Sequence, residues 1–219
     1  MLTIEKIIHA QRVLEEALYT TEIKRAAGLT DRCELFLKTE NLQKTGSFKI
    51  RGAYYKIACL SPEEKKRGVI ACSAGNHAQG VALAAQKNGI PALICLPDGA
   101  PISKVEATRS YGAELCLVPG VYDDAYERAL QLQKERKLTF IHPFDDEDVI
   151  AGQGTIGLEI LSQLKNVDAV VVPVGGGGLI SGVAFAVKQM NPNVRVYGVQ
   201  AAGAASMPVS YTHLRAHET

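Results

Sequence analysis

Three short segments carry residue types that could do chemistry, and each lies where an apolar run gives way to a predicted helix. The first is the run TGSFKIRGA at residues 45–53. Lys49 falls in the first turn of that helix, where unpaired N–H groups and the positive end of the helix dipole disfavour an ammonium ion. Its amine would therefore be neutral more often and would react more readily with a carbonyl group. The alternative is an ordinary solvated surface lysine.

The second segment is CSAGNHAQG at residues 72–80, again at the end of a predicted strand. Ligands bind at this end of the strands in open α/β sheets. The backbone N–H groups of the turn, the Ser73 hydroxyl and the Asn76 amide could together hold a carboxylate. His77 has two interpretations: a general base or, as we prefer, a residue at a helix N-terminus that is hydrogen-bonded to a neighbour.

The third segment is VVVPVGGGGLISG at residues 170–182, in which a buried strand leads into four glycines and a helix that starts at about Leu179. Without Cβ atoms, this backbone could wrap around an anion at the helix N-terminus. The run lacks the lysine of a Walker loop and does not fit the pattern GxGxxG, which disfavours a nucleotide-binding module. A single phosphate ester fits better, and a plain tight turn is the alternative.

Together the three segments would supply a reactive amine, a carboxylate-binding turn and a phosphate-binding loop. A phosphorylated aldehyde cofactor that reacts with amino acids needs these three features, and pyridoxal 5′-phosphate is such a cofactor. The sequence therefore indicates an enzyme that uses pyridoxal 5′-phosphate on a small amino-acid substrate.

Short apolar runs alternate with helix-like segments, which predicts an α/β fold. Most runs are rich in Val, Ile and Leu without strict alternation, as is typical of strands buried on both faces of a parallel sheet. Three glycines in one helix, Gly152, Gly154 and Gly157, predict close packing against another element or a ligand. The predicted strands are Glu34–Thr39, Val69–Cys72, Ala92–Leu96, Glu114–Val118, Thr139–His142, Ala169–Val174 and Val194–Gln200. The predicted helices are Phe48–Leu60, His77–Asn88, Ser103–Tyr111, Tyr122–Lys137, Glu147–Leu164 and Leu179–Met190.

Composition narrows the class of protein. The 219 residues carry a formal net charge of +1 and no basic block, so nucleic-acid binding is not expected. No apolar run approaches the roughly 20 residues that cross a bilayer, and the N-terminus lacks a signal-peptide pattern, so we expect a cytoplasmic protein without membrane contact. The five cysteines form no CxxC pair, which argues against a disulfide framework and a structural zinc site.

The segment at residues 208–219 does not continue the alternation of predicted strands and helices. His213 and His217 would share a helix face, but no third ligand is in view and no metal is expected. We expect this segment to be a non-native tail, because Tyr211–Thr219 resembles translated sequencing-adapter sequence. On this interpretation the natural chain continues beyond residue 207.

The same motifs resemble those of the fold-type II family of pyridoxal-phosphate enzymes, and within it the threonine dehydratases. The resemblance covers about residues 20–207 and includes HPFDD at residues 142–146 and VIAGQGTIGLE at residues 149–159. It implies a tryptophan synthase β-like fold with two parallel-sheet α/β domains. A large domain at residues 1–66 and 145–207 would be incomplete, and a small domain would span residues 67–144. A homo-oligomer is expected at full length.

The resemblance also implies roles by position. Lys49 would bond the cofactor and later move the Cα proton of the substrate. The residue that the family places near the pyridine nitrogen, a hydroxyl or a thiol, has no match in this sequence. Cofactor contacts would come from Phe48, Lys49, Asn76, Gly175, Gly176, Gly177, Gly178 and Leu179. Substrate contacts would come from Ser73, Ala74, Gly75, Asn76 and His77.

The reaction that the resemblance implies is β-elimination from L-threonine to give 2-oxobutanoate and ammonia, or from L-serine to give pyruvate, with a place in isoleucine biosynthesis as one expectation. Serine racemase and other lyases of the family are alternatives. Ala74 stands where the racemases carry a second serine that acts as a base, so racemisation should be weak. Another alternative is a fragment that binds the cofactor without turnover. Because several large-domain strands are absent, the isolated 219 residues are expected to fold poorly or to be inactive.

Overall fold

The computed structural model describes residues 1–204, and the predicted tail with His213 and His217 lies outside the described residues. Within them, no helix has the length and apolar character needed to span a membrane. The helices are α1 (Ile4–Glu15), α2 (Lys49–Ala58), α3 (Pro62–Arg67), α4 (Asn76–Asn88), α5 (Ile102–Ser110), α6 (Tyr122–Arg136), α7 (Glu147–Gln163) and α8 (Gly178–Met190), with 3-10 helices η1 (Glu40–Leu42) and η2 (Ala202–Ala204). The strands are β1 (Ile23–Arg25), β2 (Phe36–Lys38), β3 (Val69–Cys72), β4 (Ala92–Pro97), β5 (Glu114–Val118), β6 (Thr139–Phe140), β7 (Ala169–Pro173) and β8 (Arg195–Val199).

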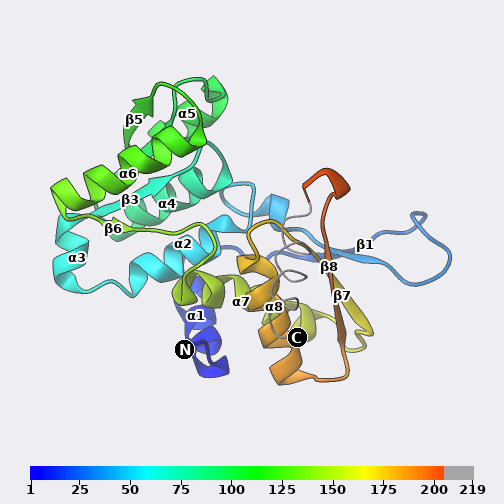
Figure 1. Ribbon diagram of the computed structural model, residues 1–219. Helices are drawn as coiled ribbons and strands as arrows, with labels where there is room; N and C mark the ends of the chain where they lie inside the picture. The colour runs from blue at the N-terminus through cyan, green and yellow to red at the C-terminus, as the bar shows by residue number, and fades with distance from the viewer. Residues whose placement is uncertain (205–219) are drawn as a thin grey trace, which may run out of the picture.

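A four-stranded parallel sheet in the order β5-β4-β3-β6 lies at the upper left of Figure 1. Side chains of β3 alternate between its faces: Val69 and Ala71 join the core that includes α4, whereas Ile70 and Cys72 join the core that includes α6. Helices thus cover both faces, which explains why all four residues of β3 are buried. The predicted α/β fold with parallel strands is confirmed here, while the proposed domain boundaries stay a prediction.

A second parallel pair, β7-β8, packs against α8 on one face. Val170 and Val172 share a core with Val183 of α8, whereas Val171 between them is 62% exposed. The expectation that Ala169–Val174 is buried on both faces is therefore wrong. The reason is that, among the described residues, helices cover this pair on one side only.

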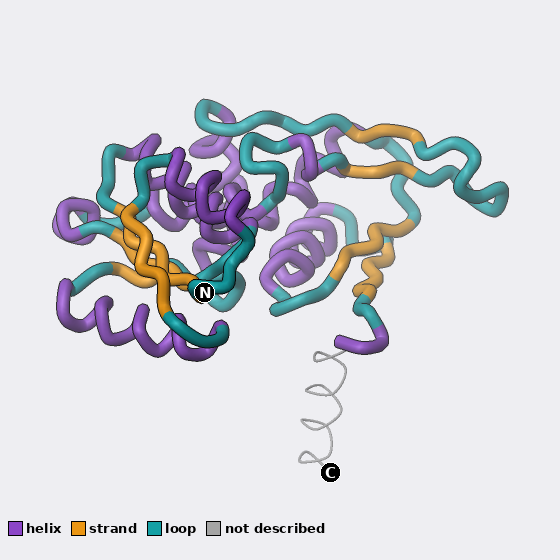
Figure 2. The backbone as a smooth tube through the Cα atoms, turned by 90° about the horizontal axis from the view of Figure 1, so that it is seen from above, coloured by secondary structure: helices purple, strands orange, loops and turns teal. Residues whose placement is uncertain are grey.

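The predicted strand Glu34–Thr39 forms only as β2, which pairs antiparallel with β1. The pair and its connecting loop make an arm that extends away from the helices (Figure 2). The residues of both strands are partly or fully exposed. This run therefore differs from the buried parallel strands that the sequence indicates for most of the runs, because no helix layer among the described residues encloses the arm.

Helices α2, α7 and α8 approach one another closely at glycines. A Cβ atom on Gly152 of α7 would lie 2.7 Å from the Cα atom of Gly52 on α2. A Cβ atom on Gly154 would lie 3.0 Å from the carbonyl oxygen of Gly182 on α8. Side chains at these positions would push the helices apart, so the prediction that the glycines of α7 permit close packing is confirmed.

Replacing Gly152 with Ala is expected to lower the free energy of unfolding by about 2 kcal/mol, a typical cost of overpacking. The added methyl group would lie 2.6 Å from the carbonyl oxygen of Arg51, and α2 would have to move. Chemical denaturation measures the change. Gly99→Ala is the control, because a Cβ atom there meets no heavy atom within 4 Å. Equal stability of the two variants would contradict the role of close helix packing.

Candidate active site

Lys49 begins helix α2, as the sequence predicts. Its Nζ donates a hydrogen bond to the carbonyl oxygen of Pro143 at 2.8 Å and lies 5.5 Å from the centroid of the Phe48 ring. Burial lowers the pKa of this amine below its usual range. Because a neutral amine attacks a carbonyl carbon more readily than an ammonium ion does, the site favours the chemistry expected of Lys49.

Helix α4 brings the second segment against Lys49. A Cβ atom on Gly80 would lie 3.1 Å from the backbone nitrogen of Ile50 and 3.2 Å from the carbonyl carbon of Lys49. Glycine therefore lets α4 touch the start of α2. In the turn before α4, Ser73 Oγ accepts the backbone N–H of Gly75 at 3.1 Å. The first N–H groups of α4 have no acceptor within the helix and can face a ligand.

Asn76 and His77, the first two residues of α4, make contacts with different elements. The exposed side chain of Asn76 accepts a hydrogen bond from Lys104 Nζ at 3.4 Å, so the site includes a cation that the sequence patterns did not single out. His77 is 4% exposed, and its Nε2 lies 2.8 Å from the carbonyl oxygen of Ile141. Burial lowers the pKa of His77 to about 4, so the ring is neutral at pH 7. This contact matches the interpretation of His77 as hydrogen-bonded to a neighbour.

The four glycines at residues 175–178 form the turn that leads into α8. Gly177 has a φ of 91°, in the left-handed region that favours glycine. A Cβ atom on Gly178 would lie 2.7 Å from the carbonyl oxygen of Phe144, and one on Gly176 would overlap the Phe144 ring. Gly175 has open space on its Cβ side, and the N–H groups at the start of α8, including that of Leu179, point out of the helix end. The loop is thus both a tight turn and a helix start suited to an anion.

A short segment at residues 141–144 joins all three parts of the site. Its carbonyl oxygens accept from His77 and from Lys49, at Ile141 and Pro143 respectively. Its Phe144 side chain packs on the glycine turn. Sequence patterns do not show which backbone carbonyl groups accept hydrogen bonds from distant side chains. The contacts of this segment with Lys49 and His77 are therefore seen only in the three-dimensional structure.

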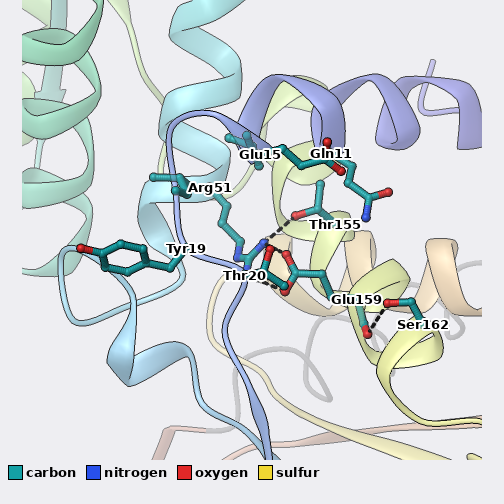
Figure 3. Close-up of a pocket in the computed structure, with 10 residues that line it drawn as sticks. Gln11, Glu15, Tyr19, Thr20, Arg51, Thr155, Glu159 and Ser162 are labelled. Atoms are coloured by element: carbon teal, nitrogen blue, oxygen red, sulfur yellow. Dashed lines mark hydrogen bonds and ion pairs between the residues drawn. The ribbon is translucent and has the colours of Figure 1, made fainter.

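Arg51, two residues after Lys49, ties the start of α2 to other elements (Figure 3). Its guanidinium donates to Glu40 at 2.8 Å and to Glu159 at 2.6 Å. Burial of the side chain disfavours its charge, but hydrogen bonds with the two carboxylates raise the pKa of Arg51. The guanidinium therefore stays charged although it is 1% exposed.

The pocket in Figure 3 lies beside this ion-pair network. Its lining includes Arg51, Thr155 and Glu159, but none of residues 72–80 or 175–179. We therefore place the chemistry at Lys49 and the two helix starts, and not in this pocket.

Comparison with known proteins shows the family to which the chain belongs. Residues 14–219 match the family described as pyridoxal-phosphate dependent enzyme. The chain is 57% identical over 218 residues to the L-threonine ammonia-lyase of Thermotoga maritima, and 48% identical over 212 residues to the catabolic L-threonine dehydratase of Escherichia coli K12. These matches cover 99% and 96% of this chain but 54% and 64% of the two relatives, so the chain spans about half to two thirds of their length.

Among solved structures, maize serine racemase is similar to this chain with a TM-score of 0.90 and 39% sequence identity. The similarity covers 93% of this chain and 62% of the racemase chain. It confirms the fold-type II architecture that the sequence motifs imply.

Burial of His77 is expected to make stability depend on pH. Its pKa of about 4 in the folded protein lies below the ordinary value of 6.5, so the unfolded chain binds this proton more readily. The stabilising contribution is complete above about pH 6.5 and is lost as the pH falls toward 4, by about 3 kcal/mol in total.

Urea titrations at pH 7 and pH 4.5 measure that loss. His77→Gln keeps an N–H donor but does not titrate, so its free energy of unfolding should fall less between the two pH values. The same loss in both proteins would show that His77 is not its source.

Proposed function

The chain belongs to the family of pyridoxal-phosphate-dependent enzymes, and from this membership we propose that the protein converts L-threonine to 2-oxobutanoate and ammonia. Water is eliminated first and is taken up again when the product of the elimination hydrolyses to release ammonia. The observation that carries the proposal is the partly buried Lys49 amine, which donates to the Pro143 carbonyl oxygen. The two relatives are named L-threonine ammonia-lyase and L-threonine dehydratase, which supports the same substrate. L-Serine would give pyruvate by the same chemistry.

The residues present fit the cofactor of this family. Lys49 offers the amine with which the aldehyde of the cofactor would react. The N–H groups of residues 175–179, with open space beside Gly175, suit its phosphate. The turn at residues 73–77 then suits the carboxylate of an amino acid. When bound, pyridoxal phosphate supplies an electron sink that makes the Cα proton of the substrate acidic.

The side chains of the site would orient the substrate and move its protons. The Ser73 hydroxyl and the first N–H groups of α4 would bind the substrate carboxylate, and the nearby charge of Lys104 would add attraction. Lys49 would take the Cα proton at Nζ, and burial, which lowers the pKa of this amine, favours the neutral form that this step needs. The Phe48 ring beside that amine would help to exclude water.

The wider setting of the enzyme is part of the proposal. The relative from E. coli is named as catabolic, which favours a catabolic role over the expected place in isoleucine biosynthesis. We also propose a cytoplasmic homo-oligomer at full length. Because the chain spans 54% of the Thermotoga relative, the expectation that these 219 residues alone are inactive stays a prediction.

In the full-length protein, replacing Lys49 with Ala should reduce keto-acid formation from L-threonine by about 10³-fold or more, since the base at Nζ is lost. The visible absorbance of the lysine-bound cofactor should disappear together with the activity. Lys188→Ala is the matched control, because the Lys188 amine also donates to a proline carbonyl but lies exposed at the far end of α8. Activity of the Lys49 variant within tenfold of the control would refute the assignment.

Ala74 distinguishes the proposed lyase from a racemase of the same fold. An alanine side chain has no acidic proton to donate, so pyruvate formed from L-serine should exceed D-serine by about 100-fold or more. Ala74→Ser should raise the share of D-serine, which chiral chromatography of the products measures. Comparable amounts of D-serine and pyruvate from the protein with Ala74 would instead favour the racemase.

A further inference from the structure

His142 closes a tight turn at the segment that joins the three parts of the site. Its Nδ1 accepts the backbone N–H of Asp145 at 2.7 Å and that of Phe144 at 3.3 Å. Because both groups donate to it, Nδ1 carries no proton, and the neutral ring holds its proton at Nε2. Asn and Asp side chains close turns in the same way, by accepting N–H groups a few residues ahead.

The turn sets the direction of two groups that contact the site. Pro143 presents its carbonyl oxygen to Lys49 Nζ at 2.8 Å. The Phe144 ring stands against the glycine turn, and its centroid lies 4.6 Å from that of the His142 ring. Since Pro143 has no N–H group, the N–H groups of the next two residues are the first that can close the turn, and both donate to His142.

We propose that His142 is a positioning residue, which holds the Pro143 carbonyl on the Lys49 amine and the Phe144 ring on the glycine turn. This inference deepens the proposed function and rests on it, because Lys49 is the group that is positioned. His142 acts through the backbone of its own turn and needs no contact with substrate.

The surroundings of His142 keep Nδ1 available as an acceptor at neutral pH. Burial lowers the pKa of the ring, and the positive charge of Lys49 acts in the same direction. The carboxylates of Asp145 and Asp146 act against this shift. The neutral ring of His77 on α4 also faces this region. Protonation of Nδ1 would break both hydrogen bonds, so the turn is expected to open when the pH falls through the pKa of His142.

Matched substitutions separate the acceptor atom from the bulk of the ring. Asn Oδ1 lies as many bonds from Cα as His Nδ1, so His142→Asn can accept the same N–H groups. His142→Gln is one methylene longer and misplaces its oxygen, and His142→Leu has no acceptor. In the full-length protein, keto-acid formation should stay within about threefold of the wild type in the Asn variant and fall about tenfold in the other two.

Two readouts on the protein without cofactor test the inference independently of turnover. Amide hydrogen exchange at Asp145 should be about tenfold faster in the Gln and Leu variants, because the hydrogen bond is lost. The rate at which acetic anhydride labels Lys49, relative to Lys188 as internal reference, should rise in the same two variants, since the amine leaves the Pro143 carbonyl. Both rates should be unchanged in the Asn variant.

The outcomes are distinguishable. Faster exchange at Asp145 and faster labelling of Lys49 in the Gln and Leu variants, with neither change in the Asn variant, support the inference. Equal effects of Asn and Gln, or faster exchange without faster labelling of Lys49, would overturn it. A full-length wild-type protein that forms no keto acid but shows the exchange and labelling pattern would overturn the proposed function and leave the positioning by His142 supported.

Discussion

The buried guanidinium of Arg51 between Glu40 and Glu159 fixes where helix α2 lies, and the site depends on that placement. Removal of one partner of such a pair costs roughly 3–5 kcal/mol, because a charge is left buried alone. Lys49 lies two residues earlier, in the same turn of the helix, so the placement of α2 also fixes where the Lys49 side chain begins. The close approach of Gly52 to Gly152 brings α2 near enough to α7 for the ion pair with Glu159 to form. The ion pairs of Arg51 and the close packing of Gly52 on Gly152 thus both fix the first turn of α2.

Backbone groups near the start of α2 hold most of the other parts of the site in place. The amine of Lys49 and the ring of His77 both meet carbonyl oxygens of one segment, at Pro143 and Ile141. The side chain of Phe144 in the same segment covers the glycine turn. The groups left open toward a ligand are N–H groups at two helix starts, which is an arrangement suited to anions. The chemistry proposed here needs an amine among such anion sites, and the fold provides them together.

Local rules predicted the features that depend on a few neighbouring residues. The helix start at Lys49, the glycines of α7 and the parallel strand β3 follow from helix-dipole, steric and hydrophobic patterns, and the structure has them. Other features depend on residues that are distant in the sequence but close in the folded protein. Val171 looks like a buried residue but faces a side of the sheet that the described residues leave open. Helix α1 was missed, although the Thr3 cap and the spacing of its buried residues could have shown it. The joining segment at residues 141–144 acts through carbonyl oxygens, which sequence patterns do not distinguish.

The most direct test of the account is to find the atom that captures the cofactor. The protein is incubated with pyridoxal 5′-phosphate, reduced with borohydride and digested, and mass spectrometry locates the stable adduct. We predict modification of Lys49, whose partly buried amine has a lowered pKa and donates to the Pro143 carbonyl oxygen. An adduct on another lysine such as Lys38 or Lys44, or no adduct at all, would contradict it.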